Sequence, residues 1–333
     1  MKKIAIDAMG GEHAPQAIVE AVLSLVKQLP QTKFILFGDK NKIENCLIGV
    51  KCERIEIVNT TEVIDDSDEP VKAIKQKGDS SMVVAAKYVK DGRADALFSM
   101  GNTGALLACG IFIIGRIKGV KRPALMPTLP SSSNKLGFNM IDVGANAQSK
   151  PEYLIQWAKM AELYAEKIRK IAHPRIALLN NGAEFDKGDA LHQEVYKKLL
   201  KEDLNFVGNI EGNELFSDKA DIVVTDGFCG NIALKTLEGT SQVIVHEMKQ
   251  SLLNNGIIVK LGALLAKHGL QSLKSHFDVA RYGGAVLIGL NAPVVKTHGR
   301  SDKRPVYYTL LQIDKMLDEH LIDEFKKYFL NNN

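Results

Sequence analysis

Short apolar segments alternate with amphipathic ones along most of the chain, and this alternation is the strongest constraint on its fold. Because most of the short segments are apolar throughout, they are expected to be strands buried on both faces, as in a mainly parallel sheet. The sequence therefore predicts an α/β fold with helices on both faces of the sheet. We expect strands at residues 2–6, 34–37, 55–58, 96–99, 175–179, 206–207 and 222–225, and helices at 15–29, 80–90, 103–114, 152–170 and 190–201.

Residues 231–280 depart from this alternation and are expected to form a projecting helical extension. No strand pattern occurs from Asn231 to Phe277, and the helical pattern breaks near residues 254–256. After the break, one helix face is apolar, with Leu261 at its centre. Two interpretations remain: a core or dimer helix, or a basic amphipathic face that touches a membrane surface. The chain is thus interpreted as a single large α/β unit over residues 1–333, with its core in 1–230 and 281–333 and the extension in 231–280.

Composition and charge argue against several classes of protein. The chain has 333 residues, of which 45% are hydrophobic and 25% charged, as in ordinary globular proteins. Its 43 Lys and Arg against 39 Asp and Glu leave a net charge of +4, spread along the sequence, so no nucleic-acid partner is expected. The four cysteines form no CxxC pair and are expected to be reduced, buried thiols. Residues 96–115 are uncharged over the length of a membrane span, but their interior is rich in Gly and Asn, which predicts a strand, a turn and a buried helix.

Five loops rich in Gly, Asn and Asp, most of them at strand ends, predict a binding site. They cover residues 7–12, 101–104, 142–146, 180–184 and 226–231. Ligands of open α/β sheets bind outside the carboxyl ends of the strands, where such loops converge. Glycine permits close backbone approach, and the N-terminus of a following helix favours an anion. The residues assigned to phosphate or substrate binding are Gly10, Gly11, Gly101, Asn102, Thr103, Gly104, Asp142, Asn146, Asn180, Asp226 and Gly230.

Cationic side chains downstream are suited to completing an anion site. Asn231 and Lys235 are four residues apart and share one helix face. Near the C-terminus, an apolar strand ends at Lys296 and runs into a segment containing His298 and Arg300. Asn231, Lys235, Lys296 and His298 are the catalytic candidates. For each cation, a plain solvated or structural role is the competing interpretation.

The common nucleotide and hydrolase signatures are missing from the sequence. No GxxxxGK(S/T), GxGxxG, GxSxG or HExxH motif occurs. A P-loop, a dinucleotide-binding unit, a nucleophile elbow and a catalytic zinc site therefore have little support, and neither a metal nor a cofactor is expected.

In this order, the motifs resemble those of the PlsX family of bacterial phosphate acyltransferases. The matching stretches extend over almost the whole chain, at residues 6–11, 101–106, 142–146, 208–212, 224–228, 230–236, 282–285 and 295–299. Three positions depart from the family pattern: Glu12 replaces the usual Asp, Asn181 a favoured Ile, and Cys229 a frequent Thr.

The resemblance implies reversible transfer of a fatty acyl group from acyl carrier protein to inorganic phosphate, which is a substrate and not a cofactor. The acyl phosphate would then serve a membrane-bound glycerol-3-phosphate acyltransferase in phosphatidic acid and phospholipid synthesis. A fold like that of isocitrate and isopropylmalate dehydrogenases and phosphotransacetylases is also implied. So are a homodimer built partly on the extension and a cytoplasmic location with peripheral association at the inner face of the cell membrane.

Such a reaction requires mainly placement and charge stabilisation. Phosphate is already a nucleophile near neutral pH, and a thiolate with a pKa of about 8.5 leaves readily. We expect residues 101–104 and 230–231, with Lys235 and Lys296, to hold phosphate, and His298 to stabilise the oxyanion or protonate the thiolate. Asp7, Asp142 and Asp226 are expected to orient loops or the phosphopantetheine arm rather than to act as bases, because ionised carboxylates repel phosphate.

Three rival functions remain at this point. A nicotinamide-dependent decarboxylating dehydrogenase of 2-hydroxy acids would share the implied fold. A short-chain phosphotransacetylase would use acyl-CoA as donor, and a scaffold that binds carrier protein would show no turnover.

Overall fold

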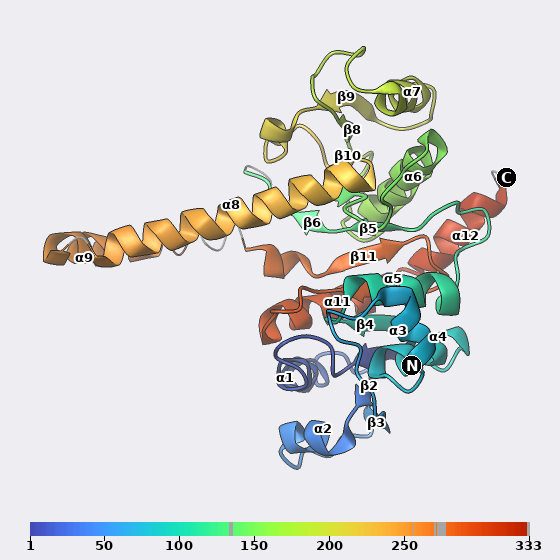
Figure 1. The fold of residues 1–333 in the computed structure, drawn as a ribbon, viewed down its shortest axis with the longest axis vertical. Coiled ribbons are helices and arrows are strands. Elements are labelled where there is room, and N and C mark those ends of the chain that lie inside the picture. The colour runs from blue at the N-terminus through green and yellow to red at the C-terminus, as the bar shows by residue number, and fades with distance from the viewer. Residues whose placement is uncertain (133–135, 255, 270, 272–277, 332–333) are drawn as a thin grey trace.

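Two sheets, which meet near the middle of the molecule, carry the strands (Figure 1). The computed structural model describes residues 1–132, 136–254, 256–269, 271 and 278–331. The first sheet has the order β3 (Ile55–Asn59), β2 (Thr32–Gly38), β1 (Lys2–Asp7), β4 (Ala96–Ser99), β12 (Val294–Lys296), β11 (Ala285–Ile288) and β5 (Ala124–Met126). The second has the order β6 (Thr128–Leu129), β7 (Phe138–Ile141), β10 (Ile222–Val224), β8 (Ile176–Leu179) and β9 (Phe206–Ile210).

Most neighbouring strands are parallel, which confirms the predicted α/β class. The exceptions lie where the two sheets meet: β11 runs antiparallel to both β12 and β5, and β6 runs antiparallel to β7. The short β5, β6 and β7 were not predicted. The chain passes between the sheets at residues 124–129, so these antiparallel strands connect the two halves.

Helices cover both faces of the first sheet, and its strands alternate accordingly. On β1 and β2, Ile6 and Phe34 belong to one buried cluster, whereas Ala5 and Phe37 belong to another on the opposite face. Residues of α1, α6, α11 and α12 pack in the first cluster, and residues of α4 and α5 in the second. The helices of the body are α1 (Gln16–Leu25), α2 (Lys40–Leu47), α3 (Pro70–Gln76), α4 (Ser81–Lys90), α5 (Thr103–Cys109) with a π-helix (Gly110–Ile114), α6 (Pro151–Lys167), α7 (Ala190–Leu199), α11 (Lys303–Asp318) and α12 (Leu321–Asn331), with short 3-10 helices at Gly212–Glu214 and Val279–Tyr282.

Two further helices, α8 (Gly227–Asn254) and α9 (Gly256–Leu265), leave the body, and α9 lies at the far end (Figure 1). Helix α8 begins at Gly227, shortly after the end of β10 at Val224 and before residue 231, the predicted start of the extension. The predicted break near residues 254–256 falls between α8 and α9. Residues 255, 270 and 272–277 of the predicted extension lie outside the described residues.

Residues 96–115 form β4, a turn, α5 and the π-helix, as the polar interior of this segment predicted. Within the ranges that the structure describes, no helix is both long and apolar enough to cross a membrane. The prediction of four buried cysteines holds for Cys109 only: Cys46 and Cys52 are half-buried, and Cys229 is exposed at the start of α8.

Candidate active site

A cleft of about 1020 Å³ opens between the two sheets. On one side lie the carboxyl ends of β4 and β12 and the first turn of α5, and on the other lie β5, β6 and the first turns of α8. Two parallel strands thus end at the cleft, as expected for a ligand site in an α/β sheet. Of the predicted site residues, the structure brings these into the lining: Gly101, Asn102, Thr103, Gly104, Asn231, Lys235, Lys296 and His298.

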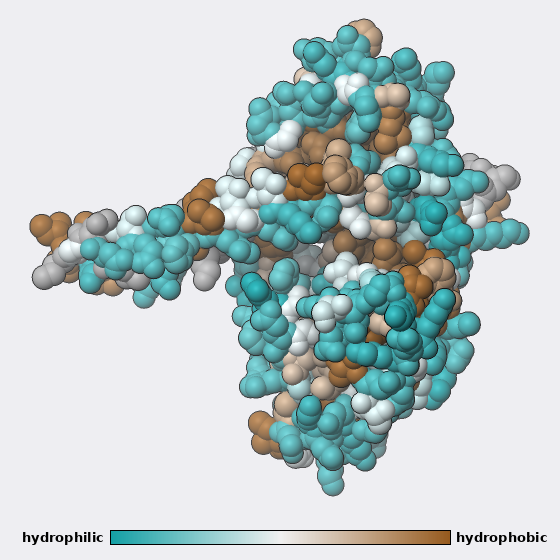
Figure 2. Space-filling model, viewed as in Figure 1, coloured by the Kyte–Doolittle hydropathy of each residue, from teal (hydrophilic) through white to brown (hydrophobic). Residues whose placement is uncertain are grey.

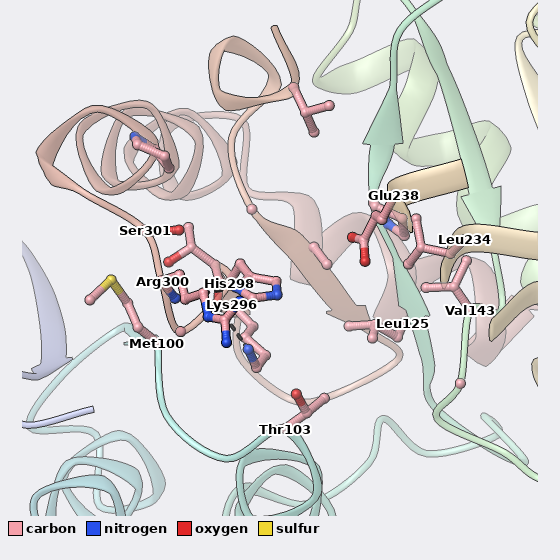
Figure 3. Close-up of a pocket in the computed structure, with 18 of the residues that line it drawn as sticks. Met100, Thr103, Leu125, Val143, Leu234, Glu238, Lys296, His298, Arg300 and Ser301 are labelled. Carbon is pink, nitrogen blue, oxygen red and sulfur yellow. Dashed lines mark hydrogen bonds between the residues drawn. The ribbon is translucent and has the colours of Figure 1, made fainter. Parts of the chain in front are cut away.

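Positive charge gathers on the side of the cleft formed by the end of β12. Figure 3 shows Lys296, His298 and Arg300 close together there, with Thr103 nearby and Glu238 across the cleft. Lys235 adds a further cation from α8. The site therefore offers several cationic groups to one anion.

Lys296 is the most enclosed of these cations. It is the last residue of β12 and pairs in register with Ser99 of β4. Its Nζ donates to the carbonyl oxygen of Thr297 at 2.8 Å. Burial lowers the pKa of Lys296, and Asp66 and Glu238 oppose that shift. Since a partly buried charge is weakly screened, Lys296 interacts more strongly with a bound anion than an exposed lysine does.

His298 is held in one orientation by the backbone next to it. The N–H of Arg300 donates to His298 Nδ1 at 3.2 Å. In the neutral ring the proton therefore resides on Nε2, which can donate it to a ligand. The Arg300 side chain pairs with Glu12 at 3.0 Å, and both are exposed, so this ion pair is weak and Arg300 can turn to an anion.

Asn102 builds the rim of the cleft with its side chain. Its Oδ1 caps α5 by accepting from Ala105 N at 3.0 Å. Its Nδ2 lies 3.2–3.3 Å from three carbonyl oxygens of the loop at residues 65–68. The groups left for a ligand are the free N–H groups of the first turn of α5 and the exposed Thr103 hydroxyl.

Three pairs of loops approach so closely that only glycine fits. A Cβ on Gly10 would lie 2.6 Å from Gly101 N, and one on Gly230 would lie 2.0 Å from the carbonyl oxygen of Asp142. Gly11, with φ +93°, packs in the same way against Gly299. Gly10, Gly11 and Gly230 were predicted to contact substrate, but they lie behind the lining of the cleft and shape the loops that form it.

Asp7 and Asp142 organise loops, and Asp142, which was also assigned to substrate binding, does not line the cleft. Asp7 is buried and accepts from Ser81 Oγ and Ser99 Oγ, both at 2.6 Å, and Ser99 Oγ in turn accepts from Gly101 N. Asp142 accepts from the N–H groups of Leu125, Gly144, Ala145 and Asn146. Burial raises the pKa of both carboxyls, against these hydrogen bonds.

Three more predicted substrate residues, besides Asp142, have structural partners and do not line the cleft. The Asn146 side chain donates to the carbonyl oxygen of Pro123 and to Asp142. Asn180 Nδ2 donates to Lys187 O and Asn209 Oδ1. Asp226 accepts from Phe228 N and Cys229 N at the start of α8, and its Oδ2 lies 3.5 Å from His192 Nε2. These side chains hold the second sheet's loops, and Asp226 fixes the beginning of α8.

Several lining residues were not predicted from the sequence. An apolar wall faces the cations and contains Leu125, Leu129, Val143 and Leu234, of which Leu125, Val143 and Leu234 are labelled in Figure 3. Acidic Glu12, Asp66 and Glu238 also line the cleft. Leu234 and Glu238 lie three and seven residues after Asn231, so they share its helix face. The helical pattern of the sequence could therefore have placed them at the site. β5 and β6 are too short to give one.

Among the side chains that the structure describes, no group of three or more His, Cys, Asp or Glu is placed to hold a metal ion.

The family described as "Fatty acid synthesis protein" matches residues 2–323. Over 99% of both chains, the sequence is 69% identical to a phosphate acyltransferase from Lactobacillus johnsonii. It is 52% identical to one from Latilactobacillus sakei, over 98% of this chain and 97% of the relative.

Among solved structures, a phosphotransacetylase from Streptococcus pyogenes aligns with a TM-score of 0.63 at 18% identity, over 96% of this chain and 94% of the other. A putative 4-hydroxythreonine-4-phosphate dehydrogenase from Salmonella typhimurium aligns with a TM-score of 0.53 at 14% identity, over 95% and 99%. These distant likenesses concern the fold alone.

Proposed function

The chain belongs to the fatty acid synthesis protein family, and on that premise we propose that acyl carrier protein is its acyl donor and the cleft its active site. The protein is an acyltransferase that transfers acyl groups to phosphate for phospholipid synthesis, like the phosphate acyltransferases it matches along its whole length. The observation that carries the assignment of the site is the pairing of a cationic wall with an apolar wall in one cleft.

Phosphate binds between Lys235, Lys296 and the first turn of α5. Lysine ammonium groups and helix N–H groups are both suited to a dianion. Asp66 and Glu238 help Lys296 keep its proton against the effect of burial. Arg300 completes the phosphate site when its side chain leaves the ion pair with Glu12 and binds a phosphate oxygen.

The thioester lies against the apolar wall, with its carbonyl carbon facing the bound phosphate. A phosphate oxygen attacks that carbon, the C–O bond forms, and the collapse of the tetrahedral intermediate breaks the C–S bond. His298 Nε2–H donates to the oxyanion and can pass its proton to the departing thiolate. Holding the reactants in this geometry and stabilising the oxyanion supply most of the rate enhancement. No cofactor is required by this chemistry.

The donor and acceptor are tested together by following loss of long-chain acyl carrier protein on gels, with and without inorganic phosphate. The product is trapped with hydroxylamine as an acyl hydroxamate. Phosphate-dependent loss with hydroxamate formation supports the proposal. Turnover with acyl-CoA and none with acyl carrier protein would instead identify a short-chain phosphotransacetylase.

We propose that the helices leaving the body form the dimer interface and the membrane contact. On α8, Val243, Ile244 and Val245 are each about 60% exposed, which is costly for an isolated helix and favours a partner helix from a second copy. On α9, Ile258 and Leu265 are more than 80% exposed, at the end farthest from the body (Figure 1). An apolar tip next to lysines suits the interface of an anionic membrane.

A location in the cytoplasm at the inner face of the cell membrane follows from this proposal. Acyl phosphates of long chains are amphiphilic, so release beside the bilayer delivers them to a membrane-bound glycerol-3-phosphate acyltransferase. We also propose that the fold is akin to that of the isocitrate and isopropylmalate dehydrogenases, and the alignment with a 4-hydroxythreonine-4-phosphate dehydrogenase shows a shared fold with one dehydrogenase.

A further inference from the structure

Three segments close to one another carry cations and no carboxylates. Residues 70–77, 81–90 and 103–122 contain nine Lys and Arg and neither Asp nor Glu. Acidic residues lie at the ends of these segments, at Glu69, Asp79 and Asp91. The charge of Lys87 helps to lower the pKa of Asp79, so this pair interacts, but the cations outnumber these carboxylates. The nine are Lys72, Lys75, Lys77, Lys87, Lys90, Arg116, Lys118, Lys121 and Arg122.

Parts of these segments line a second cavity, outside the active-site cleft. It measures about 350 Å³ and lies between α3, α4 and the π-helix. Val71, Val83 and Ile113 line it, Lys75 and Lys87 border it, and the Phe112 side chain is 64% exposed beside it. Figure 2 shows apolar surface among hydrophilic surface where α5 and α3 lie in Figure 1. We use the term basic patch for this cavity with Lys75 and Lys87 at its border, together with the other cations of the three segments.

The charges of the basic patch are mostly available to a partner. Within the described ranges, Lys77 is the member that forms ion pairs, with Asp65 and Asp68. Lys75 and Lys118 are exposed and appear in no ion pair in that part of the chain. An apolar depression bordered by exposed cations has the arrangement of many protein interfaces, with an apolar anchor site at the centre and a charged rim.

The basic patch is connected to the active-site cleft by α5. Thr103, at the start of α5, lines the cleft, and the same helical run reaches Phe112 nine residues later, about 14 Å away at 1.5 Å per residue. Helix α3 begins at the cleft as well, since a Cβ on Gly104 would meet Pro70 at 2.5 Å. A protein bound at the basic patch is therefore within reach of the cleft for a flexible thiol-bearing arm.

We propose that the basic patch is the docking surface for the acyl-bearing carrier protein, which presents a carboxylate-rich face with an apolar side chain that enters the cavity. The proposal rests on the proposed function, which supplies the carrier as donor. A second copy of this chain is a poorer occupant, because a two-fold contact would oppose two basic patches of like charge. A flat membrane surface does not fill a cavity, and the apolar tip on α9 lies elsewhere.

The test compares Lys75→Glu and Phe112→Ser with Lys42→Glu, which reverses an exposed lysine on α2 outside the basic patch. Affinity for unacylated carrier is measured by fluorescence anisotropy, and KM is measured for acyl carrier protein and for an acyl-pantetheine thioester. We expect Lys75→Glu and Phe112→Ser each to weaken carrier binding and raise the carrier KM about tenfold. The acyl-pantetheine kinetics stay unchanged, Lys42→Glu behaves as wild type, and Lys75→Glu reduces the salt dependence of binding.

Unchanged carrier affinity in both variants would overturn the proposal, as would an equal loss with both donors, which would indicate damage to the cleft. Loss of binding to vesicles of phosphatidylglycerol with normal carrier affinity would assign the basic patch to the membrane instead. Failure of the proposed function can be distinguished from failure of the docking proposal. In that case the wild-type protein would bind the carrier but show no phosphate-dependent turnover, and the anisotropy measurements alone would test the docking surface.

Discussion

Replacing Lys296 with methionine separates the catalytic contribution of its charge from its packing. Methionine has a similar length and fits the apolar end of β12, so the fold is expected to remain. The lost charge faces a phosphate that carries about −1.5 to −2 at neutral pH. At a separation of about 4 Å and an effective dielectric constant near 20, one unit charge interacts with another by about 4 kcal/mol.

The cleft is open and other cations remain. The free energy lost when the Lys296 charge is removed is therefore expected to be smaller than this Coulomb energy multiplied by the phosphate charge. Removing one electrostatic donor typically costs 10²–10³-fold in kcat, and we expect about 10²-fold in kcat or in the KM for phosphate. Lys296→Arg, which keeps the charge, should retain more activity than Lys296→Met. The assay is steady-state turnover of acyl carrier protein at varied phosphate.

Stability should respond to Lys296→Met in the opposite direction. Burial lowers the pKa of Lys296 in the folded state, so the unfolded chain binds the proton more tightly. Below that lowered pKa, the charged lysine costs folding free energy, and Lys296→Met should unfold at an equal or higher temperature. Wild-type kinetics in a folded Lys296→Met would refute the role of this cation, and unfolding of the variant would refute the account of its burial.

Three further predictions concern the elements around the cleft. Gly230→Ala should lower the free energy of unfolding in urea by about 2 kcal/mol, because the added Cβ meets backbone. Gly239→Ala, on the same helix but with no atom within 4 Å of the added Cβ, should raise it by about 0.5–1 kcal/mol. Equal effects of the two substitutions would contradict the close packing at Gly230. Hydrogen bonds to Asp226, and then to Asp189, raise the pKa of His192 in the folded protein. The stability that protonated His192 contributes is therefore complete below about pH 6.5, its unfolded pKa, and is lost as the pH rises through the raised pKa. The free energy of unfolding of His192→Gln should lack this dependence on pH, and a wild-type pH profile in the variant would contradict the role of His192. Leu261→Glu on α9 should weaken flotation with anionic liposomes while solution turnover stays normal; unchanged flotation would exclude the apolar tip.

The fold was predictable from the sequence where apolar residues follow a regular pattern over several residues. Strands buried on both faces, such as β2, are apolar over several residues and stand out between amphipathic helices. The strands β5 and β6 have two or three residues each, and their position depends on pairing with β11 and β7, far along the chain. Such pairing leaves no periodic local signal.

The site was predictable in its composition but not in its geometry. The sequence identified Lys296 and His298 because polar residues follow an apolar strand. It did not distinguish glycines that touch a ligand from Gly10 and Gly230, which permit two loops to touch each other. Asp142 and Asp226 likewise satisfy backbone N–H groups of their own loops, and that distinction requires three-dimensional contacts.

The central claim, that phosphate attacks the thioester directly in this cleft, is tested most directly by intact-protein mass spectrometry. The enzyme is mixed with acyl carrier protein without phosphate, and phosphate is added in a second step. We predict no acyl adduct on the enzyme in the first step and acyl phosphate, trapped as hydroxamate, in the second. An acylated enzyme that forms without phosphate and is discharged by it at the rate of turnover would contradict the account and place a covalent nucleophile in the cleft.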